Sequence, residues 1–110
     1  MVNPTVAYNV SIDAATPVGR KGNPLTVRPG TNQPTTINGR EFSGHALDRM
    51  QEKGIPPSVV ENTIQHGQPV PGKVPGTTAY YDPVNDITVI TDSKSGRVVT
   101  VGFGKFGGQK

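Results

Sequence analysis

His45 and Arg49 are the residues whose types and spacing are best suited to chemistry on a phosphate ester. Residues four positions apart on a helix lie next to each other on one face. A neutral imidazole can act as a general base, whereas a guanidinium keeps its proton and presents a fork of donors that fits a phosphate. Lys53 extends the row by one more turn. The spacing predicts proton transfer beside a bound phosphate, although such pairs also arise by chance on solvent-facing helices.

The predicted strands carry further candidate side chains. Tyr80 and Tyr81 are adjacent, so their side chains point to opposite faces of a strand. We expect one ring to pack in the core and the other to stack on a base or bind a phosphate. Thr91 and Thr100 are either hydroxyls directed into a cleft or ordinary strand residues. His66 stands at the expected end of a helix, where we expect it to satisfy the last carbonyls.

Several kinds of site are excluded by the residue types. The absence of cysteine excludes disulfides, thiolate zinc sites and a cysteine nucleophile. Two distant histidines and scattered acids give no metal-ligand set, so neither a metal nor a cofactor is expected. The sequence has no phosphate-cradling glycine loop and no paired carboxylates. It also has no apolar run long enough to span a bilayer, so no stable membrane association is expected.

Composition and charge narrow the fold and the partner. The chain of 110 residues has 14 Val, 6 Ile and 12 Thr against two Leu and two Met, which favours strands and excludes an all-helical bundle. The net charge is +3 and the pI is near 9.5. After Asp92 the only charged residues are Lys94, Arg97, Lys105 and Lys110. This end suits a polyanionic partner such as nucleic acid, or is a basic tail on a soluble surface.

Proline and glycine divide the chain near residue 35. Residues 1–34 hold five prolines and are predicted to be a linker, whereas residues 35–110 should form the globular domain. Thr35–Ile37 is expected to be a short strand. Asn38-Gly39 then predicts a hairpin, because this pair readily adopts the positive φ angles that a two-residue turn requires.

Two helices are expected after the hairpin. The first covers residues 44–53, with Ser43 as its N-cap and Gly54 as the left-handed residue that ends it. The second covers about residues 57–66. The pattern Ser58–Glu61 at its start is typical of a capping box.

A loop and three strands complete the predicted domain. Residues 68–76 are rich in proline and glycine and are predicted to be the loop. Strands follow over residues 77–81, 86–91 and 97–103, joined by short turns as in an antiparallel meander. The second of these strands is apolar on both faces and should be central. The predicted fold class is α+β, with two N-terminal helices packed on a small twisted antiparallel β-sheet.

Four stretches of the sequence resemble the C-terminal toxin domains of bacterial polymorphic toxins, which include contact-dependent growth inhibition (CdiA-type) and Rhs-type effectors. They are Ile37–Arg40, Ser43–Glu61, Tyr81–Val89 and Ser95–Val101. The most specific part is the H-A-x-x-R-M-x-x-x-G-I core, which begins at His45. The similarity covers residues 36–103 and implies a barnase/EndoU/colicin/RelE-like ribonuclease fold.

The resemblance implies a metal-independent endoribonuclease that acts on tRNA and is neutralised by a cognate, acidic immunity protein. A ribose 2′-OH would attack the adjacent phosphorus and leave a 2′,3′-cyclic phosphate. His45 matches the family histidine as base or acid, and Arg49 matches the family arginine that holds the phosphate. The sequence does not identify the second proton-transfer group. We expect Thr91 and Tyr81 to take part in catalysis and Lys53, Thr100, Lys105 and Arg97 to bind substrate.

The same resemblance implies delivery as the C-terminus of a large secreted or cell-surface effector, with action in the target-cell cytoplasm. Residues 1–34 would then be a pre-toxin segment. Three alternatives remain: a non-catalytic β-rich binding module of a secreted adhesin, the stand-alone ribonuclease of a toxin–antitoxin pair, and a DNA-binding domain that does not cleave. The proline- and glycine-rich segment argues against the stand-alone toxin.

Overall fold

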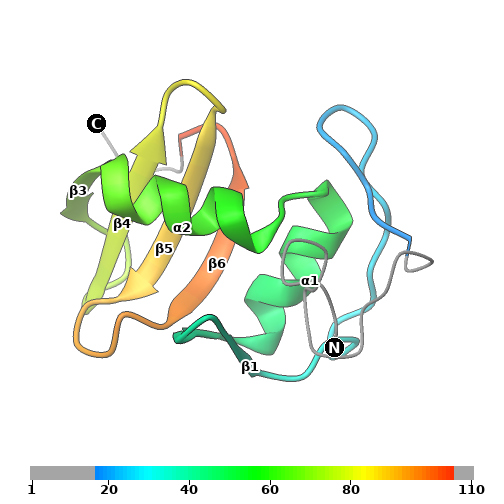
Figure 1. The fold of residues 1–110 in the computed structure, drawn as a ribbon, viewed down its shortest axis with the longest axis horizontal. Helices are drawn as coiled ribbons and strands as arrows, with labels where there is room; N and C mark the ends of the chain where they lie inside the picture. Colours follow the sequence, from blue (N-terminus) through cyan, green and yellow to red (C-terminus); the bar gives the residue numbers. More distant parts are fainter. Residues whose placement is uncertain (1–16, 106–110) are drawn as a thin grey trace.

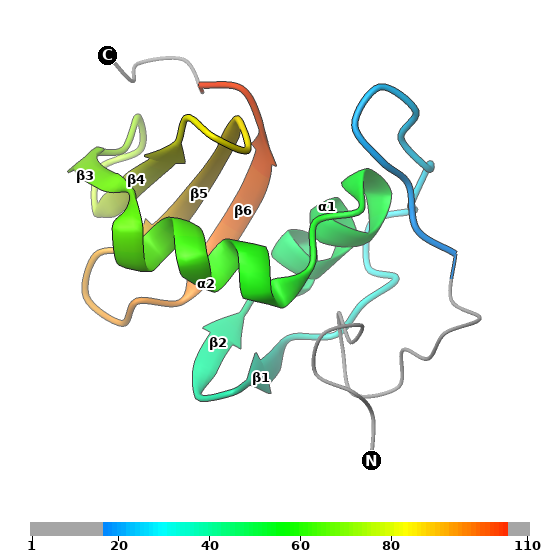
Figure 2. The ribbon, with the colours of Figure 1, turned by 45° about the horizontal axis from the view of Figure 1, so that its top comes forward.

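The strands of this protein pair into one sheet with the order β1-β2-β6-β5-β4-β3 (Figure 1). The computed structural model describes residues 17–105. In chain order the elements are β1 (Thr35–Ile37), β2 (Arg40–Phe42), α1 (Gly44–Lys53), α2 (Pro57–His66), β3 (Gln68–Pro71), β4 (Thr77–Asp82), β5 (Ile87–Asp92) and β6 (Val98–Phe103). In both views α2 lies across one face of the sheet and α1 lies beside β6 (Figures 1 and 2).

The fold class predicted from the sequence is wrong in two respects. The helices lie in the middle of the chain, after the β1–β2 hairpin, and are not N-terminal to the strands. The sheet has six strands and is mixed, because β2 and β6 pair in parallel, whereas the pattern predicts a small antiparallel sheet. The barnase/EndoU/colicin/RelE-like architecture is corrected with it. The cause is that β3 is a proline-rich segment whose pattern is typical of a loop, and that the parallel pairing of β2 joins it to a strand far away in the sequence, for which a local pattern carries no signal.

The hairpin at Asn38-Gly39 is confirmed. Asn38 has φ 51° and Gly39 has φ 82°, so both central residues are left-handed, as a two-residue turn between twisted strands requires. β1 and β2 pair antiparallel along three residues. β2 is held to β6 at a single residue pair, Phe42 with Val98. The sheet is therefore narrowest at this junction.

β3 is a strand in a segment that the sequence analysis assigns to a loop. It forms the edge of the sheet and pairs antiparallel with β4. Pro69 and Pro71 have no N–H to donate. The backbone N–H groups of alternate residues in a strand point to opposite sides, and the nitrogens of both prolines are on the side away from β4, where no bond is needed. Gly72, in the other register, donates to the Thr77 carbonyl at 2.9 Å. Prolines are tolerated here because the strand is at an edge.

A β-bulge in β6 decides which of its side chains reach the core. The pairing with β5 passes from Ile90–Thr100 to Thr91–Val98, so β6 contributes one extra residue, Val99. The bulge turns Val98 toward the core, where it is fully buried. The central position predicted for the strand over residues 86–91 is confirmed, since β5 lies between β4 and β6.

The core lies between the helices and the face of the sheet that they cover. Its buried side chains are Ile37, Phe42, Ala46, Leu47, Met50, Ile55, Val60, Ile87, Val89, Val98 and Val101. No helix within residues 17–105 covers the opposite face, called here the open face (Figures 1 and 2). By strand register Tyr81, Thr88, Ile90 and Thr100 lie on the open face. Thr88 is fully buried there, and its hydroxyl donates to the Gly104 carbonyl at 2.5 Å. No described helix is long and apolar enough to cross a membrane.

The ends of α1 are those that the sequence predicts. The Ser43 hydroxyl accepts the N–H of Ala46 at 3.0 Å, which satisfies one of the free donors of the first turn. Gly54 ends the helix in the left-handed conformation, with φ 71° and ψ 36°.

α2 begins at Pro57, as predicted, but without the predicted cap. Pro57 occupies the first turn, and no side chain caps the helix. The predicted capping box at Ser58–Glu61 is wrong, because the Glu61 carboxylate is bound by Arg40 instead. In the ion pair both oxygens of the Glu61 carboxylate accept from a charged donor, whereas in a capping box the carboxylate accepts from a neutral backbone N–H.

Residues 17–34, called here the strap, run along α1 (the blue-to-cyan segment of Figure 1). The N–H groups of Gly19 and Leu25 donate to the carbonyls of Gln51 and Glu52 at 2.8 Å each, at the end of α1 where helical carbonyls lack partners. Residues 1–16 of the predicted linker lie outside the described residues, and the domain boundary at residue 35 stays a prediction.

A buried carboxylate fastens the other half of the strap. Asp48 is 2% exposed and accepts the backbone N–H and the side-chain amide of Asn32 at 2.9 Å each, together with the N–H of Gly30 at 3.1 Å. The Asn32 amide also donates to Gln51 at 3.0 Å. The strap thus supplies the donors that a buried carboxylate needs.

Candidate functional site

His45 lies in the first turn of α1, where the helix begins beside the first residues of β6. Ser43 fixes this position, because its N–H donates to the carbonyl of Val98 at 3.0 Å and its hydroxyl donates to that of Val99 at 2.9 Å. The His45 side chain is exposed, and no residue within 17–105 forms a hydrogen bond or ion pair with its imidazole. The imidazole is therefore open to a ligand.

Arg49 lies one turn further along α1 and is half-buried. Its Nε is 3.3 Å from Oε1 of Glu52, close enough for an ion pair but not aligned as a hydrogen bond. This ion pair is the one polar contact of the guanidinium with the described residues. Glu52 therefore holds the inner nitrogen, and the two terminal nitrogens are left for another acceptor, in the fork geometry that fits a phosphate.

Glu52 is a site residue that the sequence analysis does not single out. Its Oε1 also accepts a hydrogen bond from Lys53 Nζ at 3.1 Å, so one carboxylate is shared by two cations of the predicted row. Its side chain is only 17% exposed, which limits screening by water. The signal was in the sequence, because an acid three residues after Arg49 is placed to pair with it on a helix.

The row of His45, Arg49 and Lys53 borders the buried stripe of α1. Ala46 and Met50 of that stripe are fully buried in the core. At 3.6 residues per turn the row lies on one side of the stripe, and the side chains under the strap lie on the other. The strap therefore lies on the side away from the row, in which His45 is exposed and Arg49 and Lys53 are half-buried.

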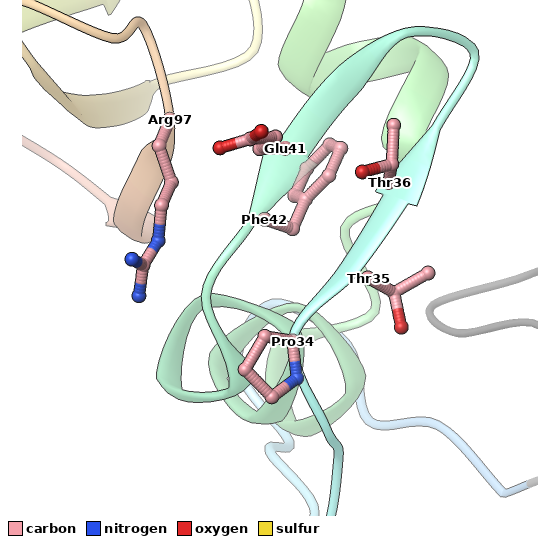
Figure 3. Close-up of a pocket in the computed structure, with 6 residues that line it drawn as sticks. All are labelled: Pro34, Thr35, Thr36, Glu41, Phe42 and Arg97. Atoms are coloured by element: carbon pink, nitrogen blue, oxygen red, sulfur yellow. The ribbon is translucent and has the colours of Figure 1, made fainter.

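A pocket of about 220 Å³ opens beside the start of α1. It is lined by Pro34, Thr35, Thr36, Glu41, Phe42 and Arg97 (Figure 3). In Figure 3 the Phe42 ring lies between Glu41 and Arg97 on one side and the two threonines on the other. The pocket is smaller than the roughly 300–1,000 Å³ typical of sites for whole ligands, so it suits only part of a nucleotide.

Arg97 is the predicted substrate-binding residue that the structure brings to the same end of β6 as His45. It is exposed and directly precedes Val98, whose carbonyl binds Ser43 just before α1. Thr91 and Thr100 are not brought together. Thr91 is 2% exposed on the core face, whereas Thr100 is half-buried on the open face.

Tyr81 and Lys105 lie at the other end of the sheet, away from the start of α1. The Tyr81 hydroxyl donates to Oδ1 of Asp86 at 2.7 Å, and the Lys105 ammonium is 5.1 Å from the centre of the Tyr81 ring. The hydrogen bond to Asp86 raises the pKa of Tyr81, and burial adds to the effect. The same bond, with the ammonium of Lys21, lowers the pKa of Asp86. The phenol thus keeps its proton, which makes it a poor proton-transfer group at neutral pH.

Arg40 and Glu61 form a paired cluster on the covered side of the sheet. Nε and Nη2 of Arg40 donate to the two oxygens of Glu61 at 3.0 and 2.9 Å, and Nη1 donates to the carbonyl of Gly96 at 3.1 Å. The hydrogen bonds to Glu61 raise the pKa of Arg40, and those from Arg40 lower the pKa of Glu61, in both cases against desolvation. Each of the three nitrogens of Arg40 donates one hydrogen bond, so this cluster holds the hairpin to α2 and to the β5–β6 turn.

His66, the second histidine, is exposed at the end of α2, and its Nδ1 is 3.2 Å from the carbonyl of Asn62. This contact agrees with the structural role predicted for it. Within residues 17–105 no three His, Cys, Asp or Glu side chains are grouped to hold a metal ion. Lys110 of the basic end lies outside the described residues.

Comparison with known proteins assigns the chain to no family. No protein-family model matches it, and no curated protein matches it.

Proposed function

We propose that this protein is an antibacterial toxin domain with metal-independent endoribonuclease activity, and that the start of α1 is its active site. The observation that carries the proposal is the row on α1, in which an exposed imidazole at His45 is followed one turn later by the Arg49 guanidinium, held by Glu52 at Nε alone. The resemblance of the segment from His45 to Ile55 to toxin domains supports the same assignment. The net charge of +3 suits a polyanionic substrate.

The reaction is transesterification of the phosphodiester, in which the phosphorus exchanges its bond to the 5′-oxygen for a bond to the neighbouring 2′-oxygen. His45 takes the proton of the 2′-OH, the 2′-oxygen forms a bond to phosphorus, and the bond from phosphorus to the 5′-oxygen breaks. Arg49 holds the non-bridging oxygens, where negative charge develops. The products are a 2′,3′-cyclic phosphate and a 5′-hydroxyl. We assign no second proton-transfer side chain, because water reaches this exposed site and can protonate the leaving oxygen.

The proposal includes a substrate, a partner and a place of action. The substrate is tRNA, and the domain reaches the cytoplasm of a target cell as the C-terminus of a larger effector. A cognate immunity protein binds over the start of α1. An acidic partner suits this face, since the Arg97 guanidinium is exposed there and that of Arg49 lies one turn beyond His45.

The test is cleavage of tRNA by the purified protein in the presence of EDTA. The wild type should yield discrete fragments with 2′,3′-cyclic phosphate ends. His45→Ala should slow cleavage by roughly 10²–10⁴-fold, as expected for loss of a general base. Arg49→Ala should slow it by roughly 10²–10³-fold through lost stabilisation of the transition state. His66→Ala is the matched control and should cleave like the wild type, because this histidine lies at the far end of α2.

Three outcomes would contradict the proposal. If RNA stays intact after incubation with the folded wild type, the proposed nuclease activity is wrong. If cells then stop growing while their RNA stays intact, a binding module is favoured. A wild-type rate for His45→Ala removes the assigned base. Loss of cleavage in EDTA removes the metal-independent mechanism.

A further inference from the structure

A second group of charged and aromatic side chains lies at the end of β6 opposite to His45. It joins β4, the start of β5 and the end of β6 with the strap. Its members are Lys21, Tyr81, Asp86, Phe103 and Lys105, linked by contacts that the structure describes. The active-site row does not use any of them.

Two aromatic rings in this group each lie beneath an ammonium. Lys105 Nζ is 5.1 Å from the centre of the Tyr81 ring, and Lys21 Nζ is 5.3 Å from the centre of the Phe103 ring. Lys21 is 59% exposed, so its charge faces water as well as the ring. Aromatic faces bordered by cations are what proteins use to stack bases and neutralise the phosphates between them.

The Tyr81 ring is oriented by its hydroxyl. The phenol donates to one oxygen of Asp86 at 2.7 Å, and Lys21 binds the other oxygen at 3.1 Å. Tyr81 lies on the open face, which no helix within residues 17–105 covers. The ring is thus held at its edge by Asp86, while its face is approached by a mobile four-carbon side chain that a base can displace.

The nearest other acid is turned away from this group. Asp82 pairs with Ile87 on the core face, and its carboxylate accepts from Val84 and Asn85 of the β4–β5 turn at 2.9 and 2.7 Å. The group therefore carries two ammonium groups and one carboxylate. Lys105 lies over Tyr81 on the open face, whereas Lys21 lies over Phe103 on the core side and pairs with Asp86. This balance favours an anionic ligand.

We infer that Tyr81 and Lys105 form a subsite for single-stranded RNA, in which one base stacks on the Tyr81 ring and the Lys105 ammonium moves to an adjacent phosphate. The choice of RNA as the ligand rests on the proposed function. Tyr81 is then a binding residue and takes no part in proton transfer. Lys21 forms an ion pair with Asp86 and lies next to the position proposed for the RNA backbone.

The position of the subsite sets its distance from the cleavage point. Ser43 places the start of α1 at Val98, and the Tyr81 group lies around Phe103, at the other end of the same strand. Five steps along a strand span roughly 17 Å. The subsite is therefore several nucleotides away from the phosphate that Arg49 would hold, and it contributes to binding and not to the chemical step.

The test measures binding of a short single-stranded oligoribonucleotide to the full chain carrying His45→Ala, which prevents cleavage during the measurement. Tyr81→Leu should weaken binding by roughly 5- to 100-fold, the cost of one lost base stack. Tyr81→Phe should bind like the parent, since it keeps the ring and loses only the bond to Asp86. Tyr80→Leu, the adjacent tyrosine on the opposite face, is the matched control and should bind like the parent.

Lysine variants test the charge. Lys105→Ala should lower the slope of log affinity against log salt by about one. Lys73→Ala, in the β3–β4 turn at the far edge of the sheet, should leave the slope unchanged. Equal slopes for the two variants would overturn the role of Lys105.

A tryptophan variant keeps the inference testable if Tyr81→Leu does not fold. The chain has no tryptophan, so Tyr81→Trp introduces a single indole whose fluorescence RNA should quench on stacking. Unchanged fluorescence at saturating RNA overturns the subsite, as does a loss of affinity in Tyr81→Phe equal to that in Tyr81→Leu.

The two proposals fail separately. If the wild type does not cleave RNA but Tyr81→Leu weakens RNA binding, the subsite stands and the active-site row is wrong. If cleavage is lost in His45→Ala but RNA binding does not depend on Tyr81, only the subsite fails.

Discussion

Asp48 is the residue on which the attachment of the strap most depends. Its carboxylate is buried, and its three donors all come from the strap residues Gly30 and Asn32. Removing the acceptor breaks two buried hydrogen bonds from Asn32 and a partly buried one from Gly30. Asp48→Ala should therefore lower the free energy of unfolding by about 2–4 kcal/mol.

Urea denaturation measures this effect. Glu41→Ala is the matched acidic control, because Glu41 is exposed on β2, and it should change the free energy of unfolding by less than about 0.5 kcal/mol. Equal stabilities of the Asp48→Ala and wild-type proteins would mean that the strap is not held by this carboxylate.

The candidate site could be predicted only in part from residue types. The neighbourhood of His45 and Arg49 follows from helix geometry, because their spacing is local. The separation of Tyr81 from His45 could not be predicted, since it depends on which end of β6 meets α1. The opposite facing of Thr91 and Thr100 depends on the bulge at Val99, and a strand pattern carries no signal for an extra residue.

At the scale of elements, the turn that ends α1 is where the strap and the helix come closest. Gly54 has φ 71°, and a Cβ on it would overlap the carbonyl oxygen of Gly19 in the strap. Gly76 has a comparable φ of 85°, but a Cβ there would meet nothing within 4 Å. The two glycines share the conformational cost of a left-handed residue and differ in the steric cost.

Alanine at each position separates these two costs. Gly76→Ala should lower the free energy of unfolding by about 1–2 kcal/mol, the cost of a left-handed side chain. Gly54→Ala should lower it further and should expose the strap to proteolysis, because the added methyl displaces Gly19. Limited proteolysis and thermal unfolding measure the two effects. Matching results for the two variants would contradict the close approach of the strap.

The elements with strong local signals were predicted with nearly the right bounds. α1 follows from its caps and α2 from the proline at its first position, whereas the hairpin turn follows from its positive-φ residues and the three strands of the meander from β-branched runs. β3 was missed because proline marks a loop unless the strand is known to be at an edge, and edge position is a property of the assembled sheet. The parallel pairing of β2 with β6 could not be predicted either, because it too depends on how the whole sheet assembles.

At the scale of the whole molecule, acid should loosen the contact between the hairpin and α2. The pKa of Glu61 is lowered in the folded protein by its hydrogen bonds to Arg40. Ionised Glu61 therefore stabilises the fold above its ordinary pKa, near 4.5, and this contribution is lost as the pH falls through the lowered folded value. The pKa values of Asp86 and Asp92 are lowered as well, which gives the same sign.

Unfolding midpoints in urea, measured from about pH 6 down to about pH 3, test this dependence. Glu61→Gln should lose less stability over this range than the wild type. Arg40→Gln should flatten the dependence in the same way, because either change removes the pair. A pH dependence in Glu61→Gln as steep as in the wild type would sink the assignment.

The single parallel junction has a consequence for when the fold can form. Phe42 pairs with Val98, the Ser43 hydroxyl bonds to Val99, and Arg40 bonds to Gly96, so these three ties each bridge 56 residues. During synthesis, α1 can contact β6 only after the residues up to Val99 have left the ribosome. A chain threaded through a narrow channel meets the same condition, whichever end enters first. The groups of the α1 row therefore reach their final positions only when residues 40–43 and residues 96–99 are on the same side of the channel.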